Sequence, residues 1–155
     1  MKKILVISNN ESLVILFREY LCLLELKTLE IVNENPPIAY YNTDDAVNKI
    51  LSSDFDVLVI GHQIAPFYFE VRSGVWKEKK EETALNVLAI ENIHSFLEGK
   101  IVISDGYTPW NSDEIMSSYK KLGVRHFINR IPFDFPDRFN NLILCLSDKC
   151  DCNNL

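Results

Sequence analysis

Short polar stretches follow four apolar runs of the sequence, and they hold the side chains that could do chemistry. His62 follows the run 56–60; its imidazole could accept a phosphoryl group or contact a ligand, or it is a loop-end histidine hydrogen-bonded to backbone. Arg130 follows the run 126–129 and could bind an anion or pair with a surface acid. Hydroxyl and amide groups follow the other two runs, at Ser8, Asn9 and Ser104. No nucleophile stands beside an identifiable base, so we do not expect an enzyme.

Buried strands that alternate with amphipathic helices must position these side chains. Continuous apolar, β-branched runs are typical of strands covered on both faces of a parallel sheet. Between them, apolar residues recur at three- and four-residue spacing, which predicts helices. Strands are predicted at 3–7, within 28–42, and at 56–60, 101–104 and 126–129, with helices over 13–24, 44–51, 83–97, 111–122 and from Pro136. This order predicts a doubly wound α/β sheet, in which ligands bind beyond the carboxyl ends of the strands.

The segment after Pro66 interrupts this pattern. It combines aromatics, a glycine and a charge run, and we predict a loop or frayed helix for FYFEVRSGVWKEKKEET. Its aromatics, with Trp110 from a later loop, could anchor a partner protein or could pack over the core. These aromatics are Phe67, Tyr68, Phe69 and Trp76.

Length and composition fit one globular domain, expected over residues 1–148 with a polar tail at 149–155. The chain has 155 residues, 47% apolar and 25% charged, which is enough to bury an ordinary core. A formal net charge of −6 argues against direct nucleic-acid binding. No export signal or apolar stretch of about 18 residues is visible, so we expect a cytoplasmic protein outside the membrane. Cys150 and Cys152 supply only two of the four ligands of a closed zinc site.

Several short motifs together resemble the receiver domain of two-component response regulators, along nearly the whole chain. The family's opening, an apolar strand followed by an acidic pair, is similar to KKILVISNNESLVILFREYL, and the stretch before its phosphorylated aspartate is similar to DDAVNKILSSDFDVLVIG. The strand that ends in a Ser or Thr is similar to IVIS, and the ending with glycine, an aromatic and Lys-Pro-Phe is similar to GVRHFINRIPF. The resemblance implies a flavodoxin-like (βα)5 fold with a five-stranded parallel sheet and helices on both faces.

The resemblance also assigns family roles to positions of this chain. In the family, an acidic pair and the acceptor aspartate hold Mg²⁺, a hydroxyl and a lysine contact the phosphoryl group, and an aromatic side chain reports the change. The acidic pair falls on Ser8 and Asn9, and the acceptor falls on Gly61, or on His62 when counted back from Pro66. The hydroxyl falls on Ser104, the aromatic on Phe127 and the lysine on Arg130, with one additional residue, Ile131, before Pro132.

These assignments leave the pocket without the carboxylates that the family's chemistry needs. Serine and asparagine oxygens are poor substitutes in a Mg²⁺ site, so we expect no metal, no cofactor and no aspartyl phosphorylation. Asp105 follows Ser104, and strand alternation should turn it out of the same pocket.

Two functions from different classes are open. The first is an atypical receiver-like module that acts by contact with a protein partner or as a homodimer, independently of aspartyl phosphate. The family's usual contact face maps to about 83–97, 126–129 and 136–147. The second is a flavodoxin-like domain that binds a small molecule or anion, although no turn carries a glycine-rich phosphate loop. Its pocket would be lined by Ser8, Asn9, Ser104 and Arg130.

Overall fold

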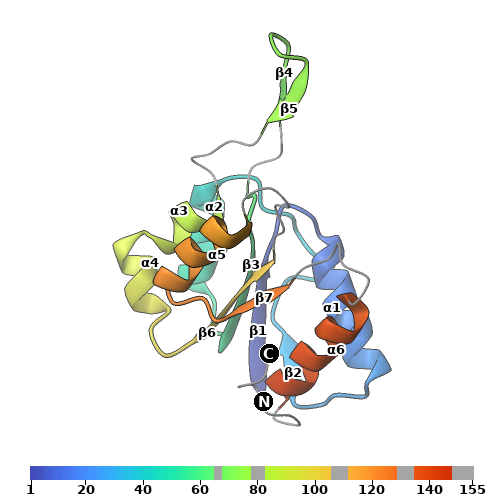
Figure 1. Cartoon of the computed structure of the whole chain (residues 1–155). Coiled ribbons are helices and arrows are strands. Elements are labelled where there is room, and N and C mark those ends of the chain that lie inside the picture. The colour runs from blue at the N-terminus through green and yellow to red at the C-terminus, as the bar shows by residue number, and fades with distance from the viewer. Residues whose placement is uncertain (65–67, 78–82, 106–111, 129–134, 148–155) are drawn as a thin grey trace.

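A five-stranded parallel sheet forms the centre of the molecule (Figure 1). The structure is a computed structural model that describes residues 1–64, 68–77, 83–105, 112–128 and 135–147. The strand order is β2-β1-β3-β6-β7, and every neighbouring pair is parallel. The strands are β1 (Lys2–Ile7), β2 (Leu29–Ile31), β3 (Val57–Gly61), β6 (Ile101–Asp105) and β7 (His126–Ile128). The predicted flavodoxin-like α/β fold is therefore confirmed, and the first of the two runs within 28–42 is the second strand.

Helices cover both faces of this sheet (Figure 1). On one face lie α1 (Ser12–Leu23) and α6 (Phe135–Leu146); on the other lie α2 (Thr43–Ser52), α3 (Ala84–Leu88), α4 (Glu91–Phe96) and α5 (Ser112–Lys121). We call these the α1/α6 face and the α2–α5 face. Each face has its own hydrophobic core, and side chains along β1 alternate between them. Ile4 and Val6 lie in the core of the α1/α6 face, and Leu5 and Ile7 lie in the core of the α2–α5 face. No helix among the described residues is long and apolar enough to cross a bilayer.

Residues 83–97 form two short helices instead of the single helix that the periodicity predicts. Ile90 adopts an extended conformation, with φ −66° and ψ 127°, and α4 begins at the next residue. An extended residue cannot continue the helical hydrogen bonds, so the chain changes direction there. Both helices then bury apolar side chains in the same core, Val87 and Leu88 from α3 and Ile93 from α4.

Residues 68–77 form a β-hairpin, so the predicted loop or frayed helix is wrong for this segment. Strand β4 (Tyr68–Glu70) pairs antiparallel with β5 (Val75–Lys77), and the hairpin extends away from the body on the side where β3 ends (Figure 1). The rings of Phe69 and Trp76 pair across the strands, with centroids 5.5 Å apart. In the turn, Gly74 has φ 67°, which glycine adopts without strain. Alternating aromatic and β-branched residues around a Ser-Gly turn are a hairpin signal that this sequence carries.

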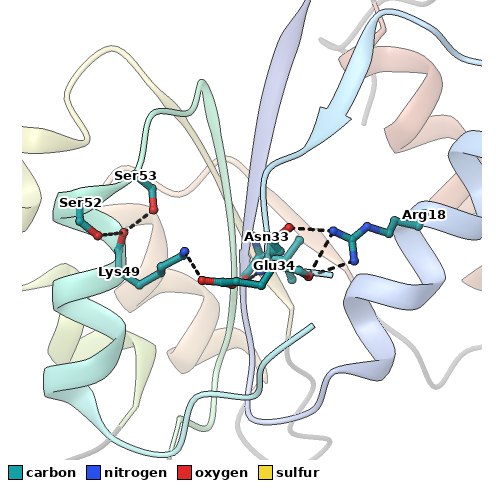
Figure 2. Close-up of polar contacts among 7 residues, drawn as sticks. Arg18, Asn33, Glu34, Lys49, Ser52 and Ser53 are labelled. Atoms are coloured by element: carbon teal, nitrogen blue, oxygen red, sulfur yellow. Dashed lines mark hydrogen bonds and ion pairs between the residues drawn. The ribbon is translucent and has the colours of Figure 1, made fainter. Parts of the chain in front are cut away.

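The segment after β2 forms hydrogen bonds with β1 and with helices on both faces of the sheet (Figure 2). Asn33 continues the ladder with its side chain: its Oδ1 accepts from the Val6 N–H at 2.9 Å, and its Nδ2 donates to the Val6 carbonyl at 2.7 Å. On one side, Arg18 of α1 donates to the Asn33 and Glu34 carbonyl oxygens at 2.8 and 3.3 Å. On the other, a hydrogen bond from Lys49 of α2 lowers the pKa of the Glu34 carboxyl.

Candidate functional site

The predicted site residues lie at the carboxyl edge of the sheet, but the sheet divides them between its two faces. Ser104 is in register with Ile60 on one neighbouring strand and with Phe127 on the other. Because Ile60 belongs to the core of the α2–α5 face, Ser104 and Phe127 share that face. Gly61 is in register with Asp105, one residue further along, so both turn to the α1/α6 face.

Ser8 and Gly61 form the group on the α1/α6 face. Ser8 is buried, its Oγ accepts from the Asn10 N–H at 3.1 Å, and its carbonyl accepts from the Tyr40 N–H at 2.8 Å. A Cβ at position 61 would lie 3.6 Å from the Ser8 Oγ, an ordinary van der Waals distance. Gly61 is also not among the residues with positive φ. Position 61 therefore has room for a side chain, and that side chain would point toward Ser8 rather than Ser104.

His62 is the residue at the end of β3 that shares the face of Ser104 and Phe127. It is buried, and its Nδ1 lies 2.6 Å from the hydroxyl oxygen of Tyr119 on α5. Tyr119 is 1% exposed, and its ring packs edge-on against both His62 and Phe127, with centroids 5.7 and 6.1 Å apart. Of the two acceptor positions that the resemblance left open, His62 is thus the one on the same face as the hydroxyl and aromatic positions, with Tyr119 in contact with both His62 and Phe127.

Tyr119 is the site residue that sequence reasoning missed. It lies within the predicted helix 111–122, where an aromatic residue on an apolar face indicates core packing and nothing more. Its partner His62 is 57 positions away in the chain. The interpretation of His62 as a loop-end histidine hydrogen-bonded to backbone is also incomplete, because its imidazole contacts the Tyr119 side chain.

Replacing Tyr119 with phenylalanine is expected to lower the free energy of unfolding by about 1–2 kcal/mol, because it removes the hydroxyl that contacts a buried imidazole nitrogen. Urea denaturation of both proteins measures the difference. Tyr41→Phe is the matched control, since Tyr41 is 56% exposed. Equal effects of the two substitutions would contradict a specific contribution from the His62–Tyr119 contact.

The remaining predicted residues contribute unequally to this edge. Ser104 is 1% exposed, and its Oγ has no hydrogen-bond partner among the residues that the structure describes. Asn9 is half-buried. Arg130, Trp110, Phe67 and the tail 149–155 with its two cysteines lie outside the described residues.

The carboxyl edge does not have the composition of a metal centre. Within the described part of the chain, no group of three or more His, Cys, Asp or Glu side chains could hold a metal ion. The hard cation Mg²⁺ requires anionic oxygens, and on the α2–α5 side the groups are hydroxyl, imidazole and phenol. This edge, as described, is therefore a packed polar cluster and not a preformed cation site.

The predicted contact face needs one correction. Its helix was assigned to 83–97, but those residues precede β6. The helix that joins β6 to β7 is α5, so it is the fourth helical element of the five βα units. The corresponding face is built from α5, β7 and α6, with β7 at the edge of the sheet.

Solved structures with the same arrangement include several response regulators. The response regulator RcsB of Salmonella typhimurium is 13% identical with a TM-score of 0.59, and the match covers 97% of this chain and 62% of RcsB. The chemotaxis regulator CheY4 of Vibrio cholerae is 14% identical with a TM-score of 0.58, over 92% of this chain and 97% of CheY4. A member of a streptococcal redox-sensor family that evolved from two-component response regulators is 10% identical with a TM-score of 0.58, over 96% of this chain and 52% of that one.

The chain has the fold of a response-regulator receiver domain. This confirms the fold implied by the resemblance in sequence motifs, and the order β2-β1-β3-β6-β7 is the one observed. No protein-family model and no curated protein matches the sequence. At these identities the likeness establishes the fold, and function has to be argued from the site.

Proposed function

We propose that this protein is a cytoplasmic receiver-like signalling module that acts through protein contacts, without aspartyl phosphorylation and without enzymatic activity. The observation that carries the proposal is that neither candidate for the acceptor position offers a carboxylate. Gly61 has no side chain, and His62 is buried with its imidazole in contact with the Tyr119 hydroxyl, whereas phosphotransfer would need a carboxylate beside a cation. Ser8 and Asn9 replace the acidic pair. The streptococcal redox sensors that evolved from response regulators support the idea that this fold serves other inputs.

The alternative, a small-molecule or anion binder at the same edge, has less support. Its pocket would combine Ser8, Asn9, Ser104 and Arg130, but strand alternation places Ser8 and Ser104 on opposite faces of the sheet. On the α2–α5 face, the Tyr119 ring occupies space beside His62. A ligand would have to displace a packed aromatic side chain, which favours the contact module.

Incubation with acetyl phosphate and Mg²⁺ is expected to leave the intact mass of the protein unchanged, because no carboxylate acceptor faces a cation site. Intact-mass spectrometry before and after incubation is the measurement, with a phosphorylatable receiver domain as the positive control. Inorganic phosphate and sulfate are expected to leave the melting temperature unchanged. An adduct of one phosphoryl group on a carboxylate would overturn the proposal, and stabilisation by phosphate that Arg130→Ala abolishes would favour the anion binder.

The hairpin 68–77 provides a candidate contact surface in addition to α5, β7 and α6. Phe69 and Trp76 are 49% and 69% exposed, and Val75 is 51% exposed, although such side chains are usually buried. Exposed aromatic pairs of this kind are typical anchors of protein interfaces. An ion pair between Glu70 and Lys77, with atoms 2.9 Å apart, connects the two strands.

The double substitution Phe69→Ser/Trp76→Ser is expected to leave the melting temperature within about 2 °C of wild type, since both side chains are largely exposed. Self-association or partner binding should weaken at least about tenfold, as expected when interface anchors are removed. Sedimentation velocity measures self-association, and affinity capture with quantitative mass spectrometry compares partners. Ile15→Ser/Leu23→Ser is the matched control, because these side chains are 44% and 76% exposed on α1. Equal losses in both double variants would contradict a specific role for the hairpin.

A further inference from the structure

A concave surface lies at the amino edge of the sheet, opposite the carboxyl edge described above. It has a volume of about 610 Å³ and is lined by residues at the ends of α4, α5 and α6 and at the starts of β6 and β7. Small organic ligands typically occupy cavities of several hundred Å³. None of the residues assigned to the carboxyl edge contributes to its walls.

The walls of this amino-edge cavity combine buried leucines with exposed or half-buried cations. Leu97, Leu142 and Leu146 are each at most 7% exposed and supply apolar surface. The charged lining residues are Lys2, Lys100 and Arg125 with one acid, Glu98, and the titratable ones include His94 and His126. With neutral histidines the lining has a formal charge of +2, three cations minus one carboxylate, in a chain of net charge −6.

Two of these cations have no carboxylate within ion-pair distance among the described residues. The Lys100 ammonium donates to the Phe55 carbonyl at 2.8 Å and lies over the Phe55 and Phe96 rings. Arg125 is exposed and takes part in none of the ion pairs described. Burial and then the Arg125 charge lower the pKa of the neighbouring His126. A hydrogen bond from Lys3, and to a lesser extent the Lys100 charge, lower the pKa of the Asp54 carboxyl, whereas Arg125 has no ion pair among the described residues.

Helix dipoles explain only part of this charge. The negative end of a helix attracts cations, but the effect falls off within the last turn. His94 lies in the last turn of α4, and Lys120 and Lys121 lie in the last turn of α5. Arg125 and His126 follow Gly123, beyond the helix end; Arg125 directly precedes β7, and His126 is its first residue. The dipole of α5 therefore does not account for the Arg125 guanidinium, which lies beside the buried leucines and is accessible to an anionic ligand.

We propose that the amino-edge cavity binds a small amphipathic carboxylate, with its carboxylate at Arg125 and His126 and its hydrocarbon chain against the leucines. A guanidinium presents a planar pair of donors that matches the two oxygens of a carboxylate. Removal of a short alkyl chain from water supplies the apolar part of the affinity. The cavity shares β7, α6 and the end of α5 with the contact face described above, but ligand binding there is a separate property, which the octanoate experiments test without a protein partner.

Octanoate is the probe, and isothermal titration calorimetry on the whole chain measures its binding. Wild type is expected to bind octanoate more tightly than 1-octanol, which lacks the charge, and more tightly than acetate, which lacks the chain. Arg125→Gln should weaken octanoate binding about tenfold or more, as expected for loss of a charge-assisted hydrogen bond. Lys121→Gln is the matched control, because it removes one cation from the same region but does not line the cavity.

An NMR pH titration of His126 provides a second readout that does not depend on affinity. A bound carboxylate stabilises the imidazolium, so saturating octanoate should raise the pKa of His126 above its value in the free protein. The proposal is overturned if octanoate fails to bind at millimolar concentration, if 1-octanol binds equally well, or if Arg125→Gln and Lys121→Gln have equal effects. None of these results bears on phosphorylation or on the hairpin, so failure here leaves the proposed function standing.

Discussion

The substitution Asn33→Ala is expected to lower the free energy of unfolding by at least about 2 kcal/mol, a larger effect than that expected for Tyr119→Phe. Asn33 is 6% exposed, and its amide satisfies both the N–H and the carbonyl of Val6 in the interior. Alanine would leave these two backbone groups unpaired, at about 1–3 kcal/mol each. Since domains are stable by only about 5–15 kcal/mol, the variant should unfold at a clearly lower urea concentration.

The control for this experiment is Asn92→Ala, because Asn92 is exposed on α4 and should change stability by less than about 0.5 kcal/mol. The slope of the free energy of unfolding against urea concentration should be the same in both variants if the folded and unfolded states keep their compactness. If the urea midpoint of Asn33→Ala equals that of Asn92→Ala, water or a shift of the backbone satisfies the Val6 groups in place of the Asn33 amide.

The strands of the sheet were predictable because each is marked by a pattern of neighbouring residues in the sequence. The runs at 3–7, 56–60 and 101–104 are continuous and β-branched, and each becomes a strand covered on both faces. The hairpin and the break at Ile90 were not predicted, for different reasons. The hairpin signal was present but the charge run beside it favoured a loop, whereas Ile90 bends so that two helices can reach one core, which no local pattern records.

The edge of the sheet at which the candidate site residues lie was predictable from the sequence, but the side-chain contacts that they make were not. The rule that polar groups gather at the carboxyl ends of strands correctly placed Ser8, Gly61 and Ser104 at one edge. Strand alternation could also have divided them between two faces, as it did for Asp105. The contact of His62 with Tyr119 and that of Asn33 with Val6 join residues 57 and 27 positions apart, so they depend on tertiary packing.

Restoring carboxylates at Asn9 and His62 is expected to create a Mg²⁺ site, which we do not expect the wild-type side chains to form. The resemblance assigns the second acidic position to Asn9, and of the two candidate acceptor positions we choose His62, which shares the face of Ser104. In Asn9→Asp/His62→Asp, two carboxylates would replace an amide and an imidazole, and their repulsion in a buried place should destabilise the metal-free protein. Mg²⁺ at ten times its dissociation constant would raise the free energy of unfolding of this variant by about 1.4 kcal/mol, which corresponds to an increase of about 3–6 °C in melting temperature.

Differential scanning fluorimetry in 10 mM MgCl₂, compared with NaCl at equal ionic strength, separates binding from screening. The matched control is Asn9→Asp/Gly61→Asp, which adds the same charge but directs the second carboxylate toward Ser8 on the other face. Wild type and this control are expected to respond by less than about 1 °C. A Mg²⁺ response in the Gly61 variant that equals or exceeds the one in the His62 variant would show that Gly61 is the true counterpart of the acceptor. It would then follow that the His62–Tyr119 contact lies beside the vacated position and does not fill it.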